Sequence, residues 1–214
     1  MNVLAIVATN RRKGTIVNIC TQYLSAAKQA GHETEMINLY DHEIKPCIGC
    51  WACAGTNKCV LSDDFESIYN RVERADVILL GVPCYWGNVP GVMKNFFDRH
   101  TGCAMFKPKN AAEFHSLTTK EKIKTIIKMA KKFGPNEGMG HKRFVWAVTM
   151  TAPFPMAQLS GDLSVTLKAL NIYTKKLKGK RIGKIVYTDT LFRFRKNKGN
   201  RIMQRAYKMG ERLT

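Results

Sequence analysis

Short apolar segments alternate with amphipathic helical segments along most of this chain, and that alternation restricts the folds open to it. Runs that suit strands occupy residues 3–8, 34–39, 76–82, 144–150 and 182–187. Apolar residues at helical spacing lie between them, which predicts helices after Thr15, after 62–64, at 92–99, from about 159–162 and at 201–213. The run 76–82 is almost continuously apolar, as expected for a central strand buried on both faces. Five strands alternating with helices predict an α/β fold with a doubly wound parallel sheet.

The length and composition are those of one soluble domain. The chain has 214 residues, of which 45% are hydrophobic and 24% are charged, and such a chain can bury a full core without disulfides. We expect residues 1–214 to form a single domain with a cysteine-rich loop at 45–61 and a basic helical insertion at 101–142, before the fourth strand. The predicted helix of that insertion, 119–133, carries isoleucines on one face and lysines on the other.

The net charge of +19 comes from two windows of the sequence. Residues 107–143 hold 10 basic and 3 acidic residues, residues 175–214 hold 14 and 2, and the remainder is balanced. A surface of this kind could bind nucleic acid or an anionic membrane surface, which makes a non-enzymatic binding protein one alternative. The chain has no helix-turn-helix, RNA-recognition or zinc-finger pattern. We therefore expect no nucleic-acid partner, and we interpret the basic surface as a docking site for an acidic electron donor.

The sequence also carries expectations about location. The first residues lack the basic region and cleavage site of a signal peptide, and no apolar stretch approaches the roughly 18–20 residues of a membrane-spanning helix. Seven cysteines, four of them crowded together, argue for thiolate chemistry in a reducing compartment rather than for a disulfide framework. A cytoplasmic protein without a transmembrane segment is expected.

Three predicted loops leave the carboxyl ends of strands, where ligands bind in sheets of this kind. The loop at 9–15 offers hydroxyls, two arginines and the start of a helix, a combination that suits a phosphate. The loop at 83–91 combines glycines with Tyr85 and Trp86, so a flat ligand could lie against it. The loop Thr149–Pro155 could close the same pocket. Together the loops indicate a monophosphate attached to a planar ring, as in FMN.

Four cysteines form the most specific motif of the chain. Cys47, Cys50, Cys53 and Cys59 follow the spacing C-x2-C-x2-C-x5-C. One turning loop with this spacing can present its sulfurs to a cubane, which favours a [4Fe–4S] cluster. Zinc also accepts four cysteines, although usually as two separated pairs, so a zinc site and a purely structural loop both stay open. Cys20 is expected in the core, and the five histidines, which show no metal-ligand spacing, are expected at the surface.

Three blocks of this sequence resemble the iron–sulfur flavoproteins, within the flavodoxin-like NADPH-dependent FMN reductase superfamily. They are VLAIVATNRRKGT at 3–15, CIGCWACAGTNKCVLSDDF at 47–65 and ADVILLGVPCYWGNVPGVMKNFFDR at 75–99. The first block departs from the usual pattern, with Ala8 and Thr9 where Gly and Ser are common. The resemblance implies a flavodoxin-like five-stranded sheet in the order 2-1-3-4-5. It also implies a homodimer or homotetramer.

The resemblance further implies particular site residues. Around the FMN phosphate it places Thr9, Arg11, Thr15 and Ile16, along the ring Pro83, Tyr85, Trp86, Gly87, Asn88 and Thr149, and on a [4Fe–4S] cluster Cys47, Cys50, Cys53 and Cys59. No side chain is expected to act as a covalent catalyst.

These inferences predict an FMN-dependent oxidoreductase. A cluster passes single electrons and FMN handles one or two, so the pair would couple NAD(P)H or a ferredoxin-like donor to the reduction of a small-molecule acceptor. The enzymatic alternative is an NAD(P)H-dependent FMN, quinone or nitro-compound reductase without a functional cluster.

Overall fold

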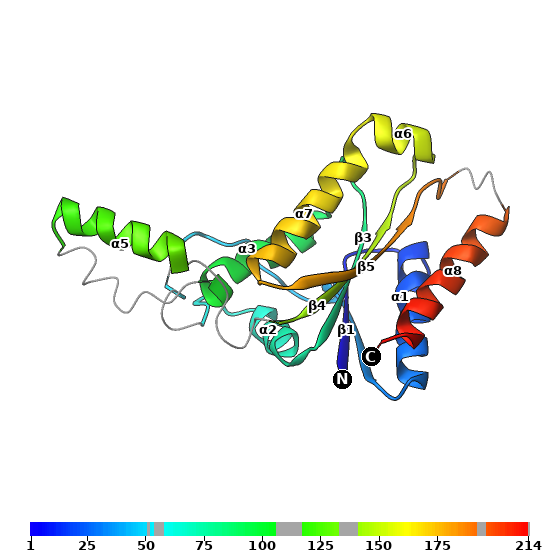
Figure 1. The fold of residues 1–214 in the computed structure, drawn as a ribbon, viewed down its shortest axis with the longest axis horizontal. Helices are drawn as coiled ribbons and strands as arrows, with labels where there is room; N and C mark the ends of the chain where they lie inside the picture. The colour runs from blue at the N-terminus through cyan, green and yellow to red at the C-terminus, as the bar shows by residue number, and fades with distance from the viewer. Residues whose placement is uncertain (51, 54–57, 106–116, 133–140, 192–195, 214) are drawn as a thin grey trace.

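The structure, a computed structural model, describes the chain except for residues 51, 54–57, 106–116, 133–140, 192–195 and 214 (Figure 1). Its strands are β1 (Asn2–Val7), β2 (Glu33–Asn38), β3 (Val77–Pro83), β4 (Arg143–Thr149) and β5 (Lys180–Tyr187). They form one five-stranded sheet in the order β2-β1-β3-β4-β5, and every neighbouring pair is parallel. The predicted doubly wound sheet and its strand order are confirmed.

Helices cover both faces of the sheet. The helices of the chain are α1 (Thr15–Gln29), α2 (Phe65–Arg74), α3 (Gly91–Met105), α5 (Thr119–Lys132), α6 (Phe154–Leu159), α7 (Asp162–Lys176) and α8 (Lys196–Glu211), with a short 3₁₀ turn, η1, at Leu39–Asp41. One face packs on α1 and α8, which lie side by side, and the other packs on α2, α3 and α7 (Figure 1).

Alternate residues along the strands build the two cores. In β1, Leu4 and Ile6 face the α2, α3 and α7 layer, whereas Ala5 and Val7 face α1 and α8. All seven residues of β3 are buried, which confirms its prediction as a central strand. Cys20 is completely buried in the α1 layer, as predicted, and burial raises the pKa of its thiol to about 12.

One helix and two helix boundaries differ from the sequence-based expectation. Helix α6 forms where a loop was predicted, because Pro155 lies in its first turn, where a missing N–H costs little. Helix α3 continues through Gly102 to Met105, and α8 begins at Lys196 and includes Gly199. A glycine inside a helix costs only about 1 kcal/mol, so it did not end either helix.

Helix α5 extends away from the sheet (Figure 1), and its Ile123 and Ile127 are exposed. The prediction of surface histidines is wrong for His100, which is buried in α3 among aromatic rings. Within the described ranges, no helix is both long enough and apolar enough to cross a bilayer.

Candidate functional site

The first predicted loop lies at the carboxyl end of β1 and leads into α1. Thr9 is buried, and its hydroxyl accepts a hydrogen bond from the Arg11 backbone N–H at 3.2 Å. The Gly14 N–H donates to the Arg11 carbonyl at 2.9 Å, which closes a tight turn at the start of the helix. Gly14 caps α1 without a side-chain hydrogen bond, and the first turn of α1 carries no acidic residue. This helix start therefore suits an anion such as a phosphate.

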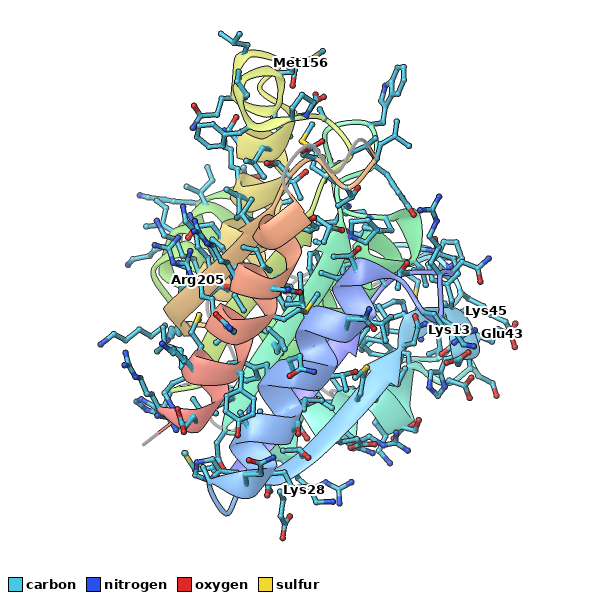
Figure 2. The ribbon with its side chains drawn as sticks, turned by 90° about the vertical axis from the view of Figure 1, so that its right-hand side faces the viewer. Lys13, Lys28, Glu43, Lys45, Met156 and Arg205 are labelled. Atoms are coloured by element: carbon cyan, nitrogen blue, oxygen red, sulfur yellow. The ribbon has the colours of Figure 1, made fainter. Side chains whose placement is uncertain are left out.

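The end of β2 is fastened to this first loop. The Asn38 side-chain amide donates to the Thr9 carbonyl at 2.8 Å. Arg12 forms an ion pair with Asp41 in η1, three residues further along the chain than Asn38. In Figure 2, Lys13 lies on the same side of the molecule as Glu43 and Lys45, which follow η1. The loop that could hold a phosphate thus adjoins the segment that leads into the cysteine loop.

The second loop is a two-residue turn that displays an aromatic ring. The backbones of Tyr85 and Asn88 exchange hydrogen bonds of 2.9 and 3.0 Å. The two residues between them, Trp86 and Gly87, have φ values of 50° and 69°, as a type I′ turn requires. Trp86 is fully exposed to solvent. Its indole is therefore held out at the surface rather than packed in the core.

The second and third loops are joined at their bases. Pro83 and Thr149 are partners in the sheet, and the Cys84 N–H donates to the Thr149 carbonyl at 2.7 Å. Beyond them lies a pocket of ≈ 400 Å³, within the range of small-ligand sites. Its lining consists of Cys84, Trp86, Gly87, Met150, Thr151, Ala152, Pro153, Met156 and Asp162. Gly87 has a positive φ, and a Cβ there would approach the Asp162 carboxylate to 2.9 Å, so a larger residue would be strained and would displace the Asp162 side chain.

The structure thus places the predicted FMN residues at one edge of the sheet. Thr9, Arg11, Thr15 and Ile16 surround the start of α1, and Pro83, Tyr85, Trp86, Gly87, Asn88 and Thr149 lie at the ends of β3 and β4. Trp86 and Gly87 line the pocket directly. Asn38 and Asp162 were missed, although a polar residue at the carboxyl end of a strand is a signal that could have identified Asn38.

The cysteine loop presents two exposed and two partly buried thiols. Cys47 and Cys50 are exposed, whereas Cys53 and Cys59 pack against the core of the α2 and α3 layer. All four are free of disulfides. Among the described residues, no three His, Cys, Asp or Glu side chains gather closely enough to hold a metal ion. The donor chemistry of four thiols suits an iron–sulfur cluster.

The two ends of the cysteine loop meet at a neck formed by Glu43, Lys45, Asp63 and Asp64. Asp63 accepts a hydrogen bond from the Lys45 N–H at 2.9 Å, and Asp64 accepts one from the Glu43 N–H at 2.8 Å. The Asp64 N–H in turn donates to the Glu43 carbonyl at 3.0 Å. These bonds hold the loop closed at its base.

Comparison with known proteins identifies a family and several relatives. The family described as NADPH-dependent FMN reductase matches residues 1–118. An iron–sulfur flavoprotein of Methanocaldococcus jannaschii is 38% identical over 99 residues, which are 46% of this chain and 51% of the relative. One from Methanosarcina thermophila is 34% identical over 99 residues, 46% of this chain and 52% of the relative. The chain thus spans about half the length of the curated relatives it matches.

Solved structures share the fold over the whole chain. An NAD(P)H:quinone oxidoreductase from Methanothermobacter marburgensis superposes with a TM-score of 0.74 at 15% identity, covering 100% of this chain and 99% of that one. An azoreductase from Bacillus anthracis gives 0.67 at 16% identity, with 100% of both chains covered. At these identities the likeness establishes the fold alone. Because the family match covers more than half of the sequence, the chain belongs to the NADPH-dependent FMN reductase family, with relatives among the iron–sulfur flavoproteins.

Proposed function

We propose that this protein is an FMN-dependent oxidoreductase that couples a [4Fe–4S] cluster to reduction of a small acceptor. The observation that carries the proposal is the direct connection between the two sites. Asn38 and the Arg12–Asp41 ion pair tie the helix start that suits a phosphate to the chain that enters the cysteine loop. Membership of the family supports FMN as a cofactor, and the names of the relatives support an iron–sulfur cluster.

The proposal assigns the phosphate and the ring of FMN to two different parts of the protein. The α1 start, with Thr9, Thr15 and the backbone at Ile16, would hold the phosphate, and Arg11 would add positive charge. The pocket beside Trp86 and Gly87 would take the ring, and Thr149 would support it from beneath. When bound, FMN would exchange one or two electrons and the cluster one at a time. The protein's own part is to bind, orient and shield these groups.

The donor in this proposal is NAD(P)H or an acidic, ferredoxin-like protein, and the acceptor is a small molecule. Exposed lysines of α5, including Lys120 and Lys124, would attract an acidic donor at low salt. We also propose that residues 1–214 act as one flavodoxin-like domain and that nucleic acid is not a partner. The cytoplasmic location stays a prediction.

A second copy of the chain is proposed to cover the pocket. Helix α6 presents Phe154, Met156 and Leu159 to solvent next to the exposed Trp86, and Figure 2 shows Met156 at the tip of the molecule. Contiguous exposed apolar side chains around a pocket are typical of an interface. Burial of this surface in a homodimer or homotetramer would exclude water from the ring. Sedimentation of a Leu159→Lys variant as a monomer would support this, and unchanged assembly would contradict it.

Anaerobic reconstitution with FMN, iron and sulfide tests the main proposal. The product is expected to show a flavin absorption band and, after reduction, the EPR signal of a [4Fe–4S] cluster. Cys47→Ser should remove the EPR signal and keep the flavin band, whereas Cys20→Ala, a buried thiol outside the loop, should keep both. A wild-type protein that never shows both signals would overturn the proposal.

A second candidate function is an NAD(P)H-dependent FMN reductase whose cysteine loop is structural. The observation in its favour is that Cys53 and Cys59 already pack as partly buried side chains against the core. Full turnover with NADPH by the Cys47→Ser variant, together with no cluster in the wild type, would select this candidate.

A further inference from the structure

Arg99 and Asp63 form a buried ion pair beneath the cysteine loop. Their side chains are 1% and 0% exposed. The two Nη atoms of Arg99 donate to the two carboxylate oxygens of Asp63 at 2.5 and 3.0 Å, a bidentate arrangement. The guanidinium also lies over the Phe65 ring, 4.6 Å from its centroid. These contacts fix the orientation of the buried Arg99 guanidinium.

This pair closes the neck of the cysteine loop from below. Asp63 accepts the Lys45 N–H, and Arg99 Nη1 donates to the Lys45 carbonyl at 3.0 Å. Lys45 and Asp63 lie 18 residues apart in sequence, and all four cysteines of the loop lie between them. The ion pair therefore holds together the two chain segments that must stay close for the loop to wrap around a bound group.

The guanidinium of Arg99 also carries a donor that these bonds do not use. The Arg99 Nε–H is buried and has no hydrogen-bond partner in the described part of the chain. A buried N–H without a partner costs free energy, and a thiolate of the cysteine loop is an acceptor that could satisfy it.

We propose that Arg99 and Asp63 act as a charged clamp that holds the neck of the cysteine loop closed and sets the reduction potential of the group held by that loop. Arg99 is thus a positioning residue rather than a catalytic one. Charge and hydrogen bonding near the sulfurs set the potentials of iron–sulfur clusters, and a buried site screens charges weakly. The buried cation raises the potential, and the buried carboxylate lowers it. The neck also reduces the entropy lost when the loop closes.

Substitutions of opposite charge test the electrostatic half of this inference, which rests on the proposed cluster. The Arg99→Gln variant should lower the midpoint potential, and the Asp63→Asn variant should raise it. A tenfold change in the reduction equilibrium is about 59 mV for one electron, and a change of this order is expected in each direction. The double variant, which removes both charges, should lie between them. Shifts in the same direction from both single variants would overturn the electrostatic role.

Cobalt binding to the cluster-free protein tests the positioning half and does not need a cluster. Arg99→Gln and Asp63→Asn should each weaken Co²⁺ binding to the reduced thiols about tenfold, because each opens the neck. Arg99→Lys keeps the charge but loses the fork, so it should weaken Co²⁺ binding and leave the potential near that of the wild type. Co²⁺ affinities equal to wild type in all three variants would overturn the positioning role.

Arg71→Gln serves as the matched control because Arg71 pairs with Glu35 in an exposed ion pair on α2. It should change neither the potential nor Co²⁺ affinity. Failure of the wild type to take up any cluster would refute the proposed function, while the Co²⁺ arm would still decide the clamp. If the wild type takes up a cluster but every variant keeps the wild-type midpoint potential and Co²⁺ affinity, the clamp alone is refuted.

Discussion

The side-chain amide of Asn38 donates a hydrogen bond to the Thr9 carbonyl oxygen at 2.8 Å and so joins the end of β2 to the loop after β1. The Oδ1 atom of the same side chain accepts a hydrogen bond from the Thr9 N–H at 3.5 Å. One side chain therefore fixes the backbone that leads to the start of α1. This contact orders the proposed phosphate loop before any ligand arrives.

Replacement of Asn38 by alanine should weaken FMN binding. The variant leaves the Thr9 backbone without its partners, at a cost of about 1–2 kcal/mol, which corresponds to roughly tenfold in Kd. Titration of the cofactor-free protein by quenching of flavin fluorescence measures the change. Asn70→Ala, at an exposed position on α2, is the control and should bind FMN as the wild type does. Equal affinities for the two variants would show that the Asn38 contact does not shape the site.

The Trp86→Gly variant should separate fold stability from flavin binding. Trp86 adopts a φ of 50°, which disfavours a residue with a bulky side chain, and its ring is fully exposed. Glycine removes about 1 kcal/mol of backbone strain, so urea unfolding of the cofactor-free protein should show unchanged or higher stability. FMN affinity should fall, because the proposed contact between the Trp86 indole and the flavin ring is lost. A variant with full affinity would exclude a contact between Trp86 and the ring.

Gly81 lies where β3 packs tightly against α1. A Cβ at this position would lie 2.7 Å from the Cys20 sulfur and 3.3 Å from Val7. Gly81→Ala should therefore lower the free energy of unfolding by about 1–3 kcal/mol through overpacking. Addition of Cys20→Ala should recover part of the loss, because the sulfur is removed. Gly91→Ala, with nothing within 4 Å of the new Cβ, is the control. Strictly additive effects of the two substitutions would contradict this contact.

His100 should make stability depend on pH between about 4 and 6.5. Burial lowers its pKa from 6.5 to about 4, although the bond of its Nδ1 to the Phe96 carbonyl at 2.7 Å opposes that shift. The unfolded chain gains the proton first as the pH falls, so this contribution is complete above pH 6.5 and is lost toward pH 4. The full loss is about 3 kcal/mol.

Urea unfolding of the cofactor-free protein at pH 7.5 and pH 5 measures this effect. The His100→Phe variant keeps an aromatic ring in the cluster and should lose less stability than the wild type between the two pH values. His141→Asn, at an exposed position with a positive φ, should retain the wild-type pH dependence. The same pH dependence in His100→Phe would show that another group is responsible.

Local patterns predicted the features that local sequence controls. The apolar run of β3 and the spacing of Cys47, Cys50, Cys53 and Cys59 are each contained in a short segment, so they were identified directly. The strand order and the residues proposed to contact FMN came from the resemblance to a family. Helix α6 was missed because prolines at its start are typical of loops as well as of first helical turns.

Contacts between distant residues could not be predicted. Asn38 and Thr9 are 29 residues apart, and Arg99 and Asp63 are 36 apart. The local sequence around each residue does not indicate which distant residue it will contact. The burial of His100 depends likewise on rings from α2 and α7 as well as α3. These pairings arise only when the sheet brings the helices and loops together, and they are the contacts that define the neck of the cysteine loop and the first loop.

Reductive titration of the reconstituted protein shows whether one chain holds both a redox-active cluster and FMN. Under anaerobic conditions, dithionite is added to protein of known FMN, iron and sulfide content, and the flavin and cluster absorption are followed together. A protein that couples a cluster to FMN should take up about three electrons per chain, two on FMN and one on the cluster. Uptake of only about two electrons, with loss of the flavin band alone, would contradict the proposal that the chain couples a cluster to FMN.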